Sequence, residues 1–180
     1  SNLTALVTAR HRMGLDQAAD AVVLVSDDSH VSLVKAARVM GLRSDAIRRV
    51  PVDATGRMQV TALESELDRL QDQKRPCLAV VATAGTTVRG AIDPLQALAD
   101  VCRERSLWLH VDGAIGAVFG LCESTASLLD GIASADSITV NPQKLLGIAK
   151  TSSLLLVRDQ TALQETFHTG LPYMEPALTG

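Results

Sequence analysis

Short, continuous apolar runs separated by helical segments of about ten residues most constrain the fold of this chain. The runs cover residues 21–25, 77–81, 107–111, 137–140 and 153–157, with a weaker one at 47–52. Apolar runs of this length without polar alternation are typical of strands buried on both faces. Strands that alternate with helices are joined by right-handed crossovers in a mainly parallel sheet. The sequence therefore predicts an α/β fold.

Helices are expected between these strands, at residues 3–10, 32–40, 61–70, 93–105 and 161–167, with a short one at 128–132. Ser1 or Asn2 is expected to cap the first helix, and the segment Thr61-Ala-Leu-Glu64 has the spacing of a capping box. Gly41 and Asp93-Pro94 are typical of a helix end and a helix start. No repeat or linker divides the chain, which predicts one domain.

Composition excludes several classes of function. The chain has 180 residues, of which 47% are hydrophobic, enough for one sizeable core. Its net charge of −3 gives no electrostatic case for binding nucleic acid or an anionic membrane. No apolar run approaches the roughly 18 residues of a membrane span. Three scattered cysteines are typical of free thiols in a reducing compartment, so a cytoplasmic protein is expected.

The two ends of the chain suggest a part of a longer enzyme. Residues 1–4 run directly into a helical pattern, and Gly180 closes a segment without a terminal element. We therefore interpret residues 1–180 as a piece of a longer protein that forms one domain.

Polar residues follow four of the expected strands. They lie at 26–30, 83–87, 112 and 141–144. In parallel sheets, ligands bind in the crevice beyond the carboxyl ends of the strands. The sequence therefore predicts one site to which these four segments contribute.

Lys144 and Asp112 are the pair that suggests a cofactor. A site for pyridoxal 5′-phosphate (PLP) needs a lysine that binds the aldehyde as a Schiff base and a carboxylate that keeps the pyridine nitrogen protonated. Lys144 follows a buried strand, where partial desolvation would favour Schiff-base formation. A surface loop lysine is the alternative interpretation. Lys150 is a rival amine, whereas Lys35 is expected mid-helix and Lys74 in a charged turn.

The surroundings of Asp112 also bear on this hypothesis. A buried carboxylate requires a partner, and a pyridinium N–H would be a charge-assisted one. The alternative is an aspartate that caps a turn. Gly113, Ala114 and Gly116 are small and would leave room for a planar ring beside the backbone.

His30 and the threonine-rich turn are weaker signals. His30 follows a strand end, where its ring could stack on a cofactor or transfer a proton, although a simple loop histidine is as compatible with the pattern. Segment 83–87 offers hydroxyls and backbone N–H groups. The other histidines, at 11, 110 and 168, form no metal-ligand pattern, so no metal is expected. No Walker loop or G-x-G-x-x-G motif is present, which argues against nucleotide binding.

Taken together, the motifs resemble the group II PLP-dependent amino acid decarboxylases, which include enzymes for aromatic amino acids, glutamate, cysteine sulfinate and diaminobutyrate. The matching segments are Ser29-His-Val-Ser32, Ala82-Thr-Ala-Gly-Thr-Thr87, Gly90-Ala-Ile-Asp-Pro94, Leu107-Trp-Leu-His-Val-Asp112, Ala135-Asp-Ser137 and Asn141-Pro-Gln-Lys144. Their order and spacing match across most of the chain.

The resemblance implies the large domain of the fold-type I PLP-dependent transferases, three α/β/α layers around a seven-stranded, mostly parallel sheet. It implies that residues 1–180 are this PLP-binding large domain, without the N-terminal segment and the C-terminal small domain of the family. It implies that Lys144 forms the Schiff base, Asp112 pairs with the pyridine nitrogen and His30 stacks on the ring and assists protonation. The further cofactor-binding residues that it implies are Ala114, Thr87, Asn141 and Gln143. Members of the family are homodimers with active sites at the subunit boundary.

The implied function is decarboxylation of an L-amino acid to the amine and CO₂. Gln143 and Leu145 stand where aromatic-type members carry histidine and an aromatic residue, which favours a small or acidic amino acid substrate. An aminotransferase or a carbon–carbon lyase of the same fold is an alternative. The same core residues would serve cleavage of the bond from Cα to CO₂ and of the bond from Cα to hydrogen. An inactive fragment that keeps the fold is a second alternative.

Overall fold

A computed structural model of the chain, described here for residues 1–168, contains one six-stranded sheet. Its order is β2-β1-β3-β4-β5-β6, in which β1 to β5 are parallel and β6 runs antiparallel to β5. The strands are β1 (Val22–Ser26), β2 (Ile47–Val50), β3 (Cys77–Thr83), β4 (Leu109–Asp112), β5 (Ser137–Val140) and β6 (Leu154–Val157). The predicted α/β fold is confirmed, with a mostly parallel, mixed sheet.

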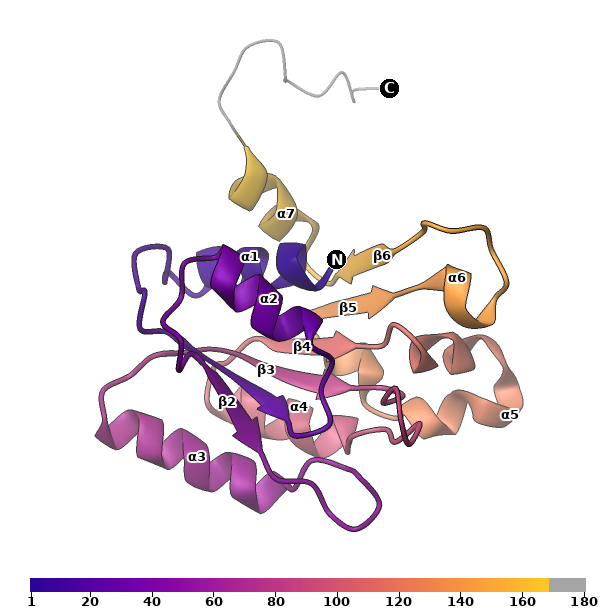
Figure 1. Cartoon of the computed structure of the whole chain (residues 1–180), viewed down its shortest axis with the longest axis horizontal. Helices are drawn as coiled ribbons and strands as arrows, with labels where there is room; N and C mark the ends of the chain where they lie inside the picture. The colour runs from indigo at the N-terminus through magenta and orange to yellow at the C-terminus, as the bar shows by residue number, and fades with distance from the viewer. Residues whose placement is uncertain (169–180) are drawn as a thin grey trace.

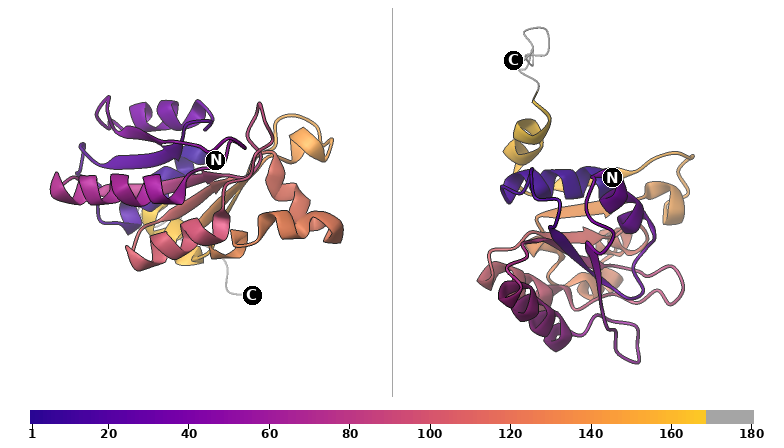
Figure 2. Two further views of the ribbon diagram at one scale, coloured as in Figure 1. Left: turned by 90° about the horizontal axis from the view of Figure 1, so that it is seen from below. Right: turned by 60° about the vertical axis from the view of Figure 1, so that its left-hand side comes forward.

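Helices cover both faces of the sheet and complete three layers (Figures 1 and 2). The longer helices are α1 (Asn2–Arg12), α2 (Ser32–Val39), α3 (Val60–Asp72), α4 (Leu95–Glu104) and α7 (Gln160–Phe167). Between β4 and β5 the chain forms short turns of helix, η1 (Gly116–Leu121), α5 (Glu123–Ala126), η2 (Ser127–Leu129) and η3 (Ile132–Ser134). The single-turn helix α6 (Pro142–Leu145) follows β5.

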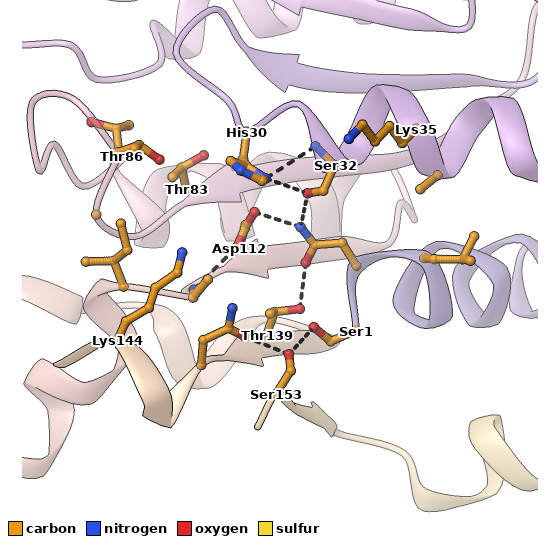
Figure 3. A pocket seen from close by; sticks show the side chains of 18 of the residues that line it. Ser1, His30, Ser32, Lys35, Thr83, Thr86, Asp112, Thr139, Lys144 and Ser153 are labelled. Atoms are coloured by element: carbon orange, nitrogen blue, oxygen red, sulfur yellow. Dashed lines mark hydrogen bonds between the residues drawn. The ribbon is translucent and has the colours of Figure 1, made fainter. Parts of the chain in front are cut away.

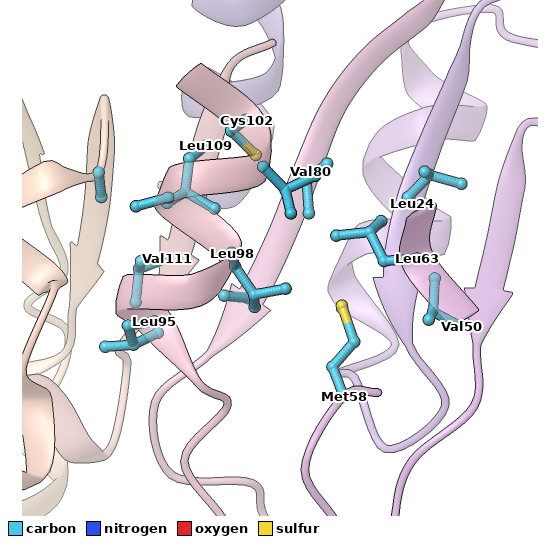
Figure 4. Close-up of a cluster of buried hydrophobic side chains, with 14 of the residues drawn as sticks. Leu24, Val50, Met58, Leu63, Val80, Leu95, Leu98, Cys102, Leu109 and Val111 are labelled. Carbon is cyan, nitrogen blue, oxygen red and sulfur yellow. The ribbon is translucent and has the colours of Figure 1, made fainter. Parts of the chain in front are cut away.

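Alternation along the strands divides the core between the two faces. In β1, Val22 and Leu24 pack on the face covered by α3 and α4 (Figure 4). Val23 and Val25 pack on the other face, with apolar residues of α1 and α2. Because both faces are buried, every residue of β1 is buried. This burial explains why the strand reads as a continuous apolar run in the sequence.

Two local expectations are wrong. The segment 128–132 forms parts of η2 and η3, separated by Gly131, instead of one helix. The capping box at Thr61 is absent, because α3 begins at Val60 and its N-cap is Gln59, which makes no side-chain cap bond. The seven strands that the family resemblance implies concern the complete domain, of which the described residues form six.

The five longer helices lie where the sequence predicts them, but α4 begins at Leu95, so Pro94 is its N-cap and not part of its first turn. Within residues 1–168 no helix combines the length and the apolarity needed to cross a bilayer.

Candidate active site

A pocket of about 370 Å³ lies at the carboxyl ends of β3, β4 and β5, next to the starts of α1 and α2 (Figure 3). It is the place predicted from the polar residues that follow the strands. Of the predicted site residues, six line it, namely His30, Thr87, Asp112, Ala114, Asn141 and Lys144.

Asp112 forms the buried end of the pocket. It is the last residue of β4 and only 4% exposed. Its Oδ2 accepts a hydrogen bond of 2.7 Å from the side-chain amide of Asn2, and its Oδ1 accepts a longer one of 3.3 Å from the backbone N–H of Ala114. Sequence reasoning did not identify Asn2 as the partner of this carboxylate.

Two buried polar groups at this end lack the partners that burial demands. Asp112 makes no ion pair within residues 1–168, although a buried carboxylate usually has a cationic partner. Thr83 pairs with Asp112 in the sheet register and lines the same pocket. Its Oγ1 is buried and has no hydrogen-bond partner in this part of the chain. A cationic, polar ligand in the pocket would satisfy both groups.

His110 lies behind Asp112 and is fully buried. Burial lowers its pKa to about 4, although the charge of Asp112 acts to raise it. The ring is therefore neutral at pH 7. Its Nε2 contacts the Asn2 side-chain oxygen at 3.2 Å, so His110 faces the polar residues behind the pocket and is not itself a lining residue.

Lys144 lies on the short helix α6, not in the loop that was expected, and its side chain extends toward the end of β4 (Figure 3). Its side chain is exposed, so the partial desolvation expected for this amine is not found in this chain. The reason is geometric, since α6 sits at the rim of the pocket and the described residues leave that rim open to solvent.

The other two candidate amines, Lys35 and Lys150, differ in whether they line the pocket. Lys150 does not line the pocket, whereas Lys35 does, from α2. Sequence reasoning dismissed Lys35 as a mid-helix residue. The position of α2 beside the pocket makes it the second amine near the site (Figure 3).

His30 lies over the pocket near Asp112 (Figure 3). Its Nδ1 accepts a hydrogen bond of 3.2 Å from the backbone N–H of Ser32 and contacts the Ser32 hydroxyl at 2.8 Å. These contacts fix the orientation of the ring. They also place the proton of the neutral ring on Nε2, because Nδ1 is used as an acceptor.

The remaining predicted residues differ in their surroundings. Asn141 accepts a hydrogen bond of 2.6 Å from Ser153, whose hydroxyl lies 2.7 Å from that of Ser1. These three side chains form a polar rim at the start of α1. Gln143 does not line the pocket, and its Oε1 accepts the backbone N–H of Ser152 at 2.7 Å.

Only one of the three small residues after Asp112 leaves room for a planar ring, as was expected of all three. A Cβ on Gly116 would lie 2.7 Å from the carbonyl oxygen of Ala84, and one on Gly113 would lie 2.6 Å from the Cβ of Ala117. Both glycines therefore allow close packing of the backbone and leave no space for a ring. Only Ala114 of the three lines the pocket.

Comparison with known proteins identifies the family. Residues 1–178 match the family described as "Pyridoxal-dependent decarboxylase conserved domain". The L-2,4-diaminobutyrate decarboxylase of Rhizobium meliloti is 44% identical over 161 residues, which cover 89% of this chain and 32% of that enzyme. The chain belongs to the pyridoxal-dependent decarboxylase family.

Solved structures share the fold. Mouse CSAD in its apo form has a TM-score of 0.90 and 36% identity, and the match covers 97% of this chain and 38% of that one. Oryza sativa TDC, solved with PLP and tryptamine, has a TM-score of 0.89 and 30% identity, with coverage of 97% and 38%. The chain spans about a third of the length of the curated relatives it matches.

Proposed function

We propose that the full-length protein is a PLP-dependent decarboxylase that converts an L-amino acid to its amine and CO₂. The observation that carries the proposal is the buried carboxylate of Asp112, which lacks a cationic partner within residues 1–168 and shares one pocket with Lys144. Family membership supports the same reaction.

The residues of the pocket fit the parts of PLP. Asp112 would hold the protonated ring nitrogen, and Lys144 would hold the aldehyde carbon through its amine. Ala114 and His30 would contact the two faces of the ring, with Thr87 near the Asp112 side. The polar rim of Asn141, Ser153 and Ser1 suits the phosphate, because the start of a helix favours negative charge. Gln143 would act on the cofactor only indirectly, by holding the loop at Ser152.

When bound, PLP supplies an electron sink for cleavage of a bond at the substrate Cα. This chain supplies orientation and electrostatics. Asp112 stabilises positive charge at the ring nitrogen, which keeps the sink effective. The Nε2–H of His30 makes no hydrogen bond within residues 1–168 and can hold or transfer a proton at the ring face.

We further propose a homodimer in the cytoplasm, with one amino acid substrate and no nucleic acid or membrane partner. Leu145, Leu146 and Ile148 are about half exposed next to Lys144, which supports coverage of this rim by a second subunit. The free thiols at 77, 102 and 122 support a reducing compartment. Sedimentation velocity of the full-length protein tests the dimer, and a monomer would contradict it.

The reaction is tested by supplying the full-length protein and PLP with a panel of L-amino acids that includes small, acidic, basic and aromatic members. Decarboxylation releases CO₂ and leaves an amine. Release of a keto acid without CO₂ would instead indicate transamination, and no turnover with any amino acid would indicate an inactive protein. The Asp112→Ala variant is the control, because it should lose turnover.

A further inference from the structure

A buried chain of polar side chains lies behind Asp112. Trp108 Nε1 donates to Ser137 Oγ at 3.0 Å, and Ser137 Oγ lies 2.8 Å from His110 Nδ1. His110 Nε2 lies 3.2 Å from Asn2 Oδ1, and Asn2 Nδ2 donates to Asp112 Oδ2 at 2.7 Å. All five side chains are buried, from 0% exposed at His110 to 8% at Asn2. Three elements, α1, β4 and β5, contribute to the chain.

The orientation of the Asn2 amide determines which atoms donate in its hydrogen bonds with Asp112, His110 and Thr139. Its nitrogen must face Asp112, because the reverse orientation would place two oxygens against each other. Its oxygen, which can only accept, therefore faces Thr139 and His110. Thr139 Oγ1 donates to that oxygen at 2.7 Å, and His110 can bond to it only by donating from Nε2.

The protonation state of His110 determines the direction of the remaining hydrogen bonds, those with Ser137 and Trp108. Because burial lowers its pKa to about 4, the ring carries a single proton at pH 7. With that proton on Nε2, Nδ1 is an acceptor and receives the Ser137 hydroxyl at 2.8 Å. The 3.2 Å approach of Nδ1 to the Ser137 carbonyl is then a contact without a hydrogen. The hydroxyl of Ser137 in turn accepts from Trp108.

We infer that Asn2 is a positioning residue for Asp112, the last link in a one-way relay of donors that runs from Trp108 through Ser137 and His110 to the carboxylate. The inference rests on the proposed function, in which Asp112 holds the ring nitrogen of PLP. Successive donors aligned in one direction polarise one another and strengthen the final bond. The relay occupies Oδ2 and leaves Oδ1, with only its 3.3 Å bond to Ala114, for the ligand.

The direction of the relay can be tested without cofactor. Nitrogen-15 NMR of the full-length apoprotein labelled on histidine reports the tautomer of each ring, and His110→Gln assigns the signal. The relay requires a neutral His110 protonated at Nε2 at pH 7. A ring protonated at Nδ1, or at both nitrogens, would overturn it.

The effect on Asp112 is tested with Asn2→Leu, which removes the amide but keeps the branched shape of the side chain. We expect PLP binding to weaken about tenfold or more, because a hydrogen bond to a charged group is lost. The nitrogen-15 signal of the ring nitrogen in labelled PLP should move toward the unprotonated position. Wild-type affinity and an unmoved ring signal in Asn2→Leu would contradict the inference.

The matched control is Thr8→Val. Thr8 is another buried polar residue of α1, but its hydroxyl donates to the Thr4 carbonyl at 3.0 Å, away from Asp112. This variant should leave PLP affinity and the ring signal unchanged. Failure of the wild-type protein to bind PLP would contradict the proposed function instead, and the tautomer of His110 would still decide the relay.

Discussion

At the scale of single residues, His110 gives the protein a dependence on pH. Its pKa falls from 6.5 to about 4 on folding, mainly because burial disfavours the charged ring. The unfolded chain therefore binds more protons between these two values, and stability is lost as the pH falls from 6.5 to 4. At about 1.4 kcal/mol per pH unit, this group accounts for about 3 kcal/mol.

We expect His110→Gln to remove this part of the acid destabilisation, measured as the free energy of unfolding in urea from pH 7 to pH 4. His11→Gln is the control, since the His11 side chain is 39% exposed and lies 3.1 Å from the Asp16 carboxylate at the surface. Equal pH slopes in wild type and His110→Gln would show that His110 titrates normally.

Residues of the site were predictable from the sequence where a local pattern marks them. Asp112, Lys144 and His30 each follow an apolar run closely, and strand ends meet in one crevice. Asn2 was missed as a partner because it lies 110 positions from Asp112 and only the packing of α1 brings them together. Thr83 did carry a usable signal, since it ends its strand just as Asp112 ends the next.

At the scale of elements, the passage from β4 into η1 depends on Gly116. A Cβ there would lie 2.7 Å from the Ala84 carbonyl oxygen, a backbone atom that cannot move without shifting β3. We expect Gly116→Ala to lower the free energy of unfolding by about 1–3 kcal/mol, the usual cost of overpacking. Urea denaturation measures this change.

The control lies in the same element. A Cβ on Gly120 would meet only the Leu129 side chain at 3.4 Å, an ordinary contact. Gly120→Ala should therefore change stability by less than about 1 kcal/mol. Equal losses in the two variants would mean that backbone crowding at Ala84 is not what restricts Gly116.

The elements differ in how far the sequence predicts them. The strands were predictable because burial on both faces removes polar residues from them. The segment between β4 and β5 was not, because long-range contacts determine its shape. Gly131, with φ of +94°, packs directly on the backbone of Gln96, where a Cβ would collide. No local periodicity records such a contact.

At the scale of the whole molecule, the chain forms a pocket at the strand ends whose rim, at Lys144, is open to solvent. Motif order and spacing were enough to predict the family, because the residues proposed to hold the cofactor lie at the strand ends of this domain. The substrate could not be predicted in the same way. The chain spans about a third of the length of its curated relatives, and every pocket residue to which a role is assigned here is proposed to hold the cofactor.

Lys144 is proposed to bind PLP in a pocket that Asp112 completes. Borohydride reduction of the full-length protein with PLP, followed by peptide mass spectrometry, identifies the amine that carries the cofactor. The account predicts a phosphopyridoxyl group on the peptide that contains Lys144, and its loss in Lys144→Ala. A label on Lys35 or Lys150, or no label in the wild-type protein, would contradict the account.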